Sequence, residues 1–226
     1  MKFIRYEQAD KTQIGILNQA GTDILPLSGL LPHRSYATMQ ELIENITGDE
    51  LAQLKTALHT GAACPSVPAA QVKILPPIDK PIHDILCVGV NYRDHQKEAS
   101  EALNDFKAAP RAVYFAKRAI HILGDGGEIQ SRPDLDDQLD YEVELAVIIG
   151  RRGKDIPKEE AENYIFGYSV FNDISSRRLQ NQHGQWFKGK SLDTYTAMGP
   201  VILHKSALPF PVEADVRSYV NNEKRQ

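Results

Sequence analysis

The stretch at positions 141–150 constrains the fold of this chain more than any other, because acidic and hydrophobic side chains alternate along it. Alternation with a period of two is typical of a β-strand, in which neighbouring side chains point to opposite faces. Glu142 and Glu144 would therefore share one face, where two like charges repel unless something positive lies between them. The opposite face, which we expect to point into a core, consists of Val143, Leu145 and Val147.

A divalent cation is the simplest partner for Glu142 and Glu144, although the solvent-facing side of an ordinary half-exposed strand carries glutamates in the same pattern. Asp173 comes at the end of a later strand-like run, and strand ends are where side chains converge on a site. An aspartate before a helix is also a good N-cap. Taken together, the three carboxylates predict a site in which oxygen atoms alone hold a hard divalent cation.

A second group of polar residues suggests proton transfer beside that site. His95 and Glu98 lie three positions apart, which places them on one face of a helix. A carboxylate at hydrogen-bond distance raises the basicity of a histidine, as a general base requires, although an exposed polar pair on a surface helix looks the same. Arg177 follows Asp173 by one turn and could bind a substrate carboxylate or pair with Asp173. Lys190 flanks a glycine, where a lysine is ordinarily a solvated charge.

Composition and charge limit the class of protein. The 226 residues can form one large domain, or a medium domain with a smaller one. The net charge of -4 gives no basic surface for nucleic acid, and no apolar run approaches the length of a membrane span. The first residues lack the apolar stretch of a secretory signal. Cys64 and Cys87 lie in different contexts, so we expect no disulfide framework and a cytoplasmic location.

The chain divides into three parts by its local patterns. Residues 1–64 predict a small α+β domain, in which Thr38 caps a first helix and Asp49 a second. Residues 65–84 concentrate Pro and Ala and predict a linker. Residues 85–226 are rich in short strands, whose alternation with helices is too irregular for a doubly wound sheet. The expected fold class is therefore α+β, mostly β.

The same residues give the chain a resemblance to the fumarylacetoacetate hydrolase family. Five blocks match in the family's order, and together they cover residues 83 to about 203. No single block is decisive, but five in register are highly specific. The blocks are Gly89–Glu98, Tyr114–Lys117, Tyr141–Gly150, Gly167–Arg177, and Lys190–Asp193 with Gly199 and Pro200.

The resemblance implies a mixed β-sandwich or β-roll catalytic domain, preceded by the smaller and more variable domain found in many members. It also implies that Glu142, Glu144 and Asp173 hold the metal. Members closest to fumarylacetoacetate hydrolase proper carry a fourth carboxylate where this chain has Val88. The chain therefore resembles the three-carboxylate acylpyruvase and oxaloacetate decarboxylase branch, and an all-oxygen site suits Mg²⁺ or Mn²⁺.

The other matching residues take roles in catalysis by the same resemblance. His95 and Glu98 would form a dyad that activates water, on a segment that acts as a lid in relatives. Lys190 would be the positive group near the reacting oxygens. Lys117 and Arg177 would bind the substrate.

The function implied is cleavage or isomerisation of a small 2-oxo acid, acylpyruvate-type or oxaloacetate-like, through an enolate stabilised by the metal. Hydrolase, decarboxylase and isomerase reactions share that intermediate, so the ligand set does not separate them. The family also implies a homodimer. Relatives continue past residue 226 with a further β segment, so we expect a C-terminally truncated chain. The alternative is a catalytically impaired member that serves as a binding or assembly partner.

Overall fold

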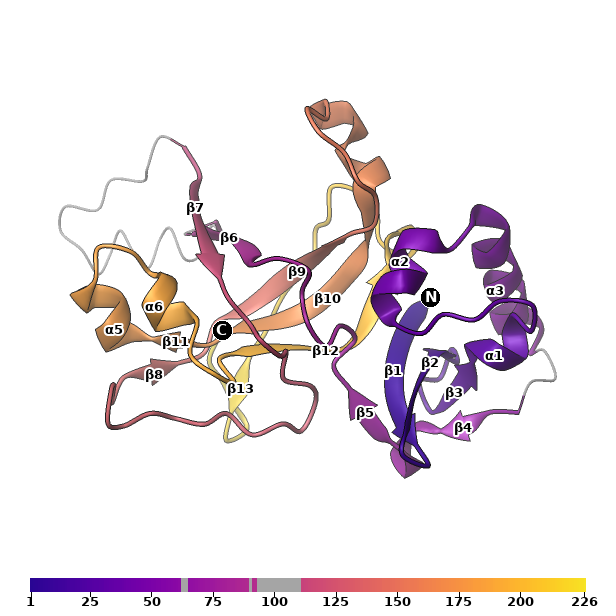
Figure 1. Ribbon diagram of the computed structural model, residues 1–226, viewed down its shortest axis with the longest axis horizontal. Helices are drawn as coiled ribbons and strands as arrows, with labels where there is room; N and C mark the ends of the chain where they lie inside the picture. The colour runs from indigo at the N-terminus through magenta and orange to yellow at the C-terminus, as the bar shows by residue number, and fades with distance from the viewer. Residues whose placement is uncertain (62–64, 90, 93–110) are drawn as a thin grey trace.

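The computed structural model describes residues 1–61, 65–89, 91–92 and 111–226, and strands dominate its α+β architecture, as expected from the sequence (Figure 1). The strands are β1 (Lys2–Gln8), β2 (Lys11–Leu17), β3 (Asp23–Pro26), β4 (Val67–Pro68), β5 (Lys73–Leu75), β6 (Ile85–Gly89), β7 (Val113–Lys117), β8 (Leu139–Asp140), β9 (Val143–Ile149), β10 (Ile165–Asp173), β11 (Ser175–Ser176), β12 (Thr196–His204), β13 (Tyr219–Val220) and β14 (Glu223–Lys224). The α-helices are α1 (Leu27–Leu30), α2 (Met39–Asn45), α3 (Gly48–Thr60), α5 (Arg177–Gln182) and α6 (Phe187–Lys190). Short 3-10 helices are η1 (Ala69–Gln71), η2 (Lys158–Tyr164) and η3 (Lys205–Ala207).

One eight-stranded sheet joins strands of the N-terminal part of the chain to β9, β10 and β12. Its strand order is β4-β3-β2-β1-β12-β10-β9, and β5 pairs in addition with β1. The connection is the antiparallel pairing of β1 with β12, in which Lys2 lies opposite Leu203 and Phe3 opposite Ile202. Three further pairs, β6–β7, β8–β11 and β13–β14, lie outside this sheet. β1 therefore supports β12 and, through it, β10 and β9, which form the candidate site.

The Pro- and Ala-rich stretch 65–84 takes part in the large sheet. β4 pairs with β3, and β5 pairs with β1 from Arg5 opposite Leu75 to Glu7 opposite Lys73. The guanidinium of Arg5 also donates to the carbonyl of Pro76, at 2.7 Å. The predicted linker is thus held along part of its length by ladder hydrogen bonds. The division of the chain into two domains stays a prediction.

The helices near the N-terminus lie beside β1, β2 and β3 (Figure 1), and their caps explain where they begin. Thr38 accepts a hydrogen bond from the backbone N–H of Glu41, as predicted for the start of α2. The cap predicted at Asp49 is wrong, because Thr47 caps α3 through a reciprocal capping box with Glu50. Asp49 instead lies in the first turn, where a negative charge is favourable. None of the described helices is long and apolar enough to cross a bilayer.

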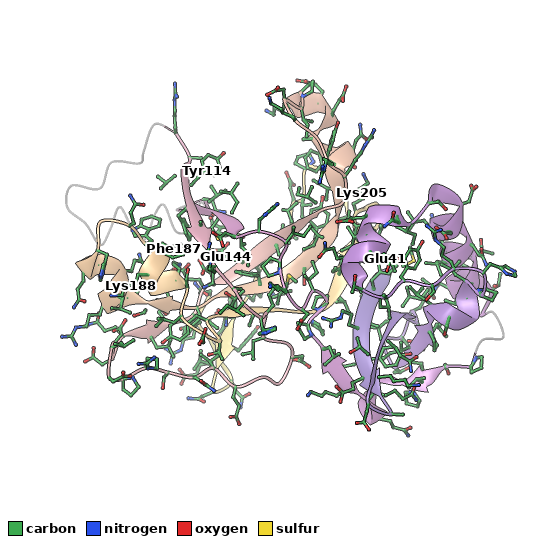
Figure 2. All side chains as sticks on the ribbon, in the orientation of Figure 1. Glu41, Tyr114, Glu144, Phe187, Lys188 and Lys205 are labelled. Carbon is green, nitrogen blue, oxygen red and sulfur yellow. The ribbon has the colours of Figure 1, made fainter. Side chains whose placement is uncertain are left out.

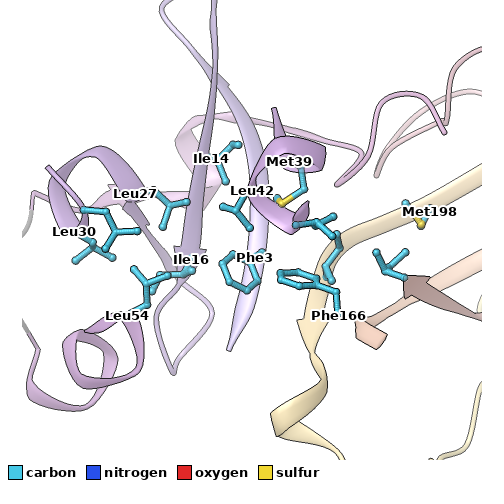
Figure 3. Packing of buried hydrophobic residues seen from close by; sticks show 14 of the residues in the cluster. Phe3, Ile14, Ile16, Leu27, Leu30, Met39, Leu42, Leu54, Phe166 and Met198 are labelled. Carbon is cyan, nitrogen blue, oxygen red and sulfur yellow. The ribbon is translucent and has the colours of Figure 1, made fainter. Parts of the chain in front are cut away.

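A single hydrophobic core joins the N-terminal elements to the large sheet. Figure 3 shows Phe3 of β1 facing Phe166 of β10, and their ring centroids lie 5.3 Å apart. Both rings are almost fully buried. The cluster extends from the helices to the sheet through Leu27, Leu30, Met39, Leu42, Leu54, Ile148, Phe166, Phe171, Met198 and Ile202. Because burial of apolar area is the main stabilising contribution, the two parts of the chain stabilise each other.

The buried face of β9 is the opposite of the one that we expected. Val147 is 47% exposed, whereas Ile148 is only 9% exposed and belongs to the shared core. Ile148 lies an even number of positions from Glu142 and Glu144, so the two glutamates continue the core-facing row of the strand. The expectation that Val147 points into a core is therefore wrong. Consequently the glutamates lie on the inner face, where charge requires a partner.

His204 is a buried histidine at the end of β12. Its ring lies edge-on to Phe166, with centroids 5.4 Å apart, and its Nδ1 accepts from the backbone N–H of Ser206 at 3.3 Å. Burial lowers the pKa of His204 to about 4, and the positive N-terminus and Lys205 lower it further. The folded protein therefore holds this imidazole neutral in a pH range where an unfolded chain would protonate it.

We predict that this histidine makes stability depend on pH. The folded pKa lies below the ordinary value of 6.5, so the unfolded state binds the extra proton and stability falls as pH drops from about 6.5 towards 4. The loss amounts to up to about 3 kcal/mol. His204→Asn keeps a capping side chain and removes this loss, whereas exposed His33→Asn leaves it unchanged. Urea unfolding at pH 7.5 and 4.5 checks this, and an equal drop in all three proteins contradicts it.

Candidate metal and substrate site

The three carboxylates predicted as metal ligands come from two neighbouring strands. Glu142 directly precedes β9, Glu144 lies in β9, and Asp173 ends β10. The backbone N–H of Asp173 donates to the carbonyl of Glu142 at 2.8 Å, and Glu144 lies opposite Phe171 in the ladder. Figure 2 shows Glu144 on the part of β9 that lies towards β6, β7 and α6. The sheet register therefore brings all three residues to one end of the strand pair.

Asp173 is buried and is neutralised from both sides by lysines. Lys117, at the end of β7, donates from Nζ to Asp173 Oδ1 at 2.6 Å and to the carbonyl of Ile174 at 2.9 Å. Lys117 is fully buried and Asp173 is 3% exposed. Burial lowers the pKa of Lys117, and the charge of Asp173 opposes that change. With this geometry Lys117 orients Asp173, and its predicted role in substrate binding stays a prediction.

Lys190 connects two of the predicted ligands. Its Nζ donates to Glu142 Oε2 and to Asp173 Oδ2, both at 2.7 Å. The ammonium also lies 5.4 Å from the ring centroid of Phe115, a cation–π contact. Gly189 lets α6 pack closely against α5, because a Cβ at position 189 would lie 2.7 Å from the backbone nitrogen of Gln180. Lys190 is 2% exposed, so it is a buried site residue and not the solvated charge that ordinary lysines are.

Arg177 is the third cationic side chain of this cluster, after Lys117 and Lys190. It contacts Asp140, a carboxylate that the sequence analysis did not identify. Its Nη2 lies 2.6 Å from Glu142 Oε1, and its Nε donates to Asp140 Oδ2 at 2.9 Å. The side chain of Arg177 is 31% exposed, so part of the guanidinium remains open. Asp140 lies two positions before Glu142, and the same period-two pattern that selected the glutamates could have found it.

Glu144 has a different environment from the other two carboxylates. Burial raises the pKa of Glu144 to about 7, while a hydrogen bond from Tyr92 opposes the rise. The nearby charges of Glu142 and Asp173 raise it further. The hydroxyl of Tyr92 also accepts from the backbone N–H of Leu145 at 3.0 Å. Glu144 therefore has Tyr92 as a hydrogen-bond partner, but its negative charge is less well compensated by nearby cations than that of Glu142 or Asp173.

The chemistry of these donors fits a hard divalent cation, since all three are carboxylates. Among the described residues, no three carboxylate, imidazole or thiol groups lie close enough together to hold one ion. Two predicted ligands, Glu142 and Asp173, nevertheless already share one positive charge, that of Lys190. The ligand set Glu142, Glu144 and Asp173 stays a prediction.

The predicted dyad, His95 and Glu98, lies outside the residues that the structure describes.

Of the two cysteines, only Cys87 is described; it is free and half-buried on β6. Burial raises the pKa of Cys87 to about 12, and the charge of Asp173 adds to the rise. Cys87 therefore stays protonated at neutral pH.

Asp136 positions the helix that carries Arg177, and no sequence pattern indicated it. This aspartate is 4% exposed. Its carboxylate accepts from the hydroxyl of Ser176, from the backbone N–H of Arg178 at 3.0 Å and from that of Gln138 at 2.7 Å. It thus caps the N-terminus of α5 from a distant loop, which is where a carboxylate satisfies unpaired N–H groups.

Replacing this cap tests its contribution. We predict that Asp136→Ala destabilises the protein by about 2–4 kcal/mol, because several buried donors lose their acceptor. The neighbouring Asp137→Ala is the matched control: its side chain is 73% exposed, and its ion pair with Arg178 spans 3.8 Å. We expect a change within about 0.5 kcal/mol there. Chemical denaturation measures both, and similar losses for the two variants would refute the assignment.

Comparison with known proteins identifies the family. The family model described as fumarylacetoacetate (FAA) hydrolase C-terminal matches residues 84–226, which is more than half of the chain. The chain therefore belongs to the fumarylacetoacetate hydrolase family, a family of enzymes that includes hydrolases and isomerases.

Particular relatives are similar over different lengths. Oxaloacetate tautomerase YisK of Bacillus subtilis (strain 168) is 46% identical over 158 residues, 70% of this chain and 51% of that protein. This chain thus spans about half the length of that relative. A solved fumarylacetoacetate hydrolase (EaFAH) from psychrophilic Exiguobacterium antarcticum is 34% identical with a TM-score of 0.77, covering 100% of this chain and 74% of that one.

A third likeness concerns the fold alone. The maleylpyruvate hydrolase from Sphingobium sp. SYK-6, solved in complex with manganese(II) ion and pyruvate, is 22% identical with a TM-score of 0.68. The match covers 100% of this chain and 75% of that one. The fold class expected from the sequence, an α+β and mostly β architecture of this family, is confirmed by these neighbours.

Proposed function

We propose that this protein is a Mg²⁺- or Mn²⁺-dependent enzyme that interconverts the keto and enol forms of a small, oxaloacetate-like 2-oxo acid. The observation that carries the proposal is the buried cluster in which Asp173 and Glu142 are surrounded by Lys117, Lys190 and Arg177. Buried charges in such number are costly and are typical of functional sites. The 46% identity to an oxaloacetate tautomerase supports the reaction class.

Different residues of the cluster would bind the metal ion and the substrate. A divalent cation held by Glu142, Glu144 and Asp173 would act as a Lewis acid on the 2-oxo acid. Lys117 keeps the carboxylate of Asp173 in a fixed orientation through its short contact at Oδ1. Arg177, whose side chain is 31% exposed, would bind a substrate carboxylate through the N–H of Nη1 that its contacts with Asp140, Glu142 and Gln180 leave unused.

Tautomerisation requires one proton to leave carbon and one to reach oxygen. In the direction from keto to enol, the C3–H bond of the 2-oxo acid breaks and an O–H bond forms at the 2-oxo oxygen, with its proton supplied by solvent water. We assign removal of the C3 proton to His95, with Glu98 raising its basicity. Lys190 is the positive group that would stabilise the charge developing on the 2-oxo oxygen.

Hydrolysis of an acylpyruvate-type C–C bond is the second candidate. It is favoured by the 34% identity to the fumarylacetoacetate hydrolase of Exiguobacterium antarcticum over the whole chain. In that reaction His95 would take a proton from water, which attacks the distal carbonyl. The same site would serve, since both reactions place negative charge on the 2-oxo oxygen.

Metal binding is tested by removing one ligand charge. We predict that Glu144→Gln weakens Mn²⁺ binding at least about tenfold, because one anionic ligand is lost while the side-chain shape is kept. Glu162→Gln, at an exposed position in η2, makes the same charge change away from the site and should bind as the wild type does. Isothermal titration calorimetry with Mn²⁺ compares the three, and equal affinities would remove Glu144 from the ligand set.

The reaction is tested with two substrates and one variant. We predict that the wild type with Mn²⁺ accelerates the decay of the ultraviolet absorbance of enol-oxaloacetate. His95→Ala should lose about 10²–10⁴-fold of this rate and keep its Mn²⁺ affinity, since proton transfer typically contributes that much. Release of pyruvate from an acylpyruvate would instead support hydrolysis. A protein that binds Mn²⁺ but turns over neither would favour the impaired binding or assembly partner.

We further propose that the protein assembles as a homodimer in the cytoplasm. One face of the β9–β10 pair exposes three apolar side chains: Val147 at 47%, Ile149 at 62% and Val170 at 56%. Val170 lies opposite Leu145 in the ladder, so these side chains are on the same face. Contiguous exposed apolar residues are typical of surfaces that another chain covers.

A further inference from the structure

We propose that the ammonium of Lys190 competes with the divalent cation for the same two carboxylates, so that cation binding displaces this lysine from Glu142 and Asp173. The inference rests on the proposed metal site. Lys190 would then have two alternative positions. In one its ammonium binds Glu142 and Asp173, and in the other it is directed towards the substrate.

The starting observation is that every oxygen of two predicted ligands already has a positive partner. Glu142 Oε1 contacts Arg177 at 2.6 Å, and Oε2 contacts Lys190 at 2.7 Å. Asp173 Oδ1 contacts Lys117 at 2.6 Å, and Oδ2 contacts Lys190 at 2.7 Å. A cation that binds these carboxylates must share an oxygen with one of the three side chains or replace it.

Lys190 is the side chain that a cation would replace, because it alone among the three contacts both ligands. Arg177 is tied to Asp140 as well, with Nε donating to Oδ2 at 2.9 Å. Lys117 is tied to the carbonyl of Ile174 at 2.9 Å. Within the described part of the chain, the ammonium of Lys190 has no hydrogen-bond acceptor other than these two carboxylates. Both of its hydrogen bonds at Nζ go to the carboxylates.

The surroundings of Lys190 offer the displaced ammonium another position. Its Nζ already lies 5.4 Å from the centroid of Phe115, and the face of an aromatic ring attracts a cation. Trp186 holds that ring edge-on, with centroids 5.2 Å apart. Rotation of the lysine side chain would therefore exchange its contacts with the carboxylates for closer contact with the Phe115 ring.

Competition has a thermodynamic consequence in both directions. If cation binding weakens the hold of Glu142 and Asp173 on Lys190, the hold of Lys190 must weaken cation binding by the same factor. Removing the ammonium leaves the two carboxylates repelling each other. That change raises the free energy of the cation-free protein and increases its affinity for the cation. A neutral replacement should therefore be less stable without cation, and bind it more tightly.

The test uses three lysine variants. We predict that Lys190→Met binds Mn²⁺ at least about tenfold more tightly than the wild type in calorimetry. In EDTA it should unfold at a lower temperature, and Mn²⁺ should raise its unfolding temperature more than it raises that of the wild type. Lys190→Gln is a second neutral variant for use if the methionine variant does not fold without cation. Lys188→Met, at an exposed position on α6, makes the same charge change and should match the wild type.

The outcomes separate this inference from the proposed function. If neither the wild type nor any variant binds Mn²⁺, the metal site itself is wrong. If all proteins bind Mn²⁺ equally, the metal site stands and competition by Lys190 is refuted. Weaker binding by the neutral variants would show that Lys190 supports the ligands and does not compete with the cation. Tighter binding by Lys188→Met as well would reduce the effect to overall charge and would also refute the inference.

Discussion

The pairing of Asp173 with two buried lysines is the interaction on which the rest of the site depends. A carboxylate that is 3% exposed cannot remain charged without close partners, and Lys117 and Lys190 supply them at 2.6 and 2.7 Å. Lys117 comes from β7 and Lys190 from α6, so this one carboxylate joins two elements outside the large sheet to the end of β10. Without it Lys117 would be buried with no carboxylate partner and Lys190 would keep only Glu142, which is more costly than the intact group.

The position of Asp173 is in turn secured by parts of the chain far from the site. β10 lies between β9 and β12, and β12 pairs with β1 at the other end of the molecule. Phe3 and Phe166 face each other in the core shared by both regions, as Figure 3 shows. The N-terminal elements therefore contribute to the site indirectly. They hold the strand whose last residue must stay within hydrogen-bond distance of two lysines.

Sequence patterns predicted the strands of the site better than its surroundings. Period-two alternation placed Glu142 and Glu144 on one face, but it did not reveal which face is buried, and Val147 turned out to be exposed. Both faces of this strand carry hydrophobic residues, so alternation alone does not orient it. Asp136 had no local signal, because it caps a helix distant in sequence. The contacts of Lys190 were equally hidden, since they depend on close approach at Gly189.

The balance of charge in the cluster bears on the proposed substrate, a small dicarboxylate. Among the described residues, Asp140, Glu142, Glu144 and Asp173 are accompanied by three cations, those of Lys117, Lys190 and Arg177. The group is therefore close to neutral by itself, which keeps the cost of burial low. A bound divalent cation would change the net charge of the group to positive, which would favour the proposed dicarboxylate substrate. If the proposed function is correct, attraction of the substrate would therefore depend on the cation having bound first.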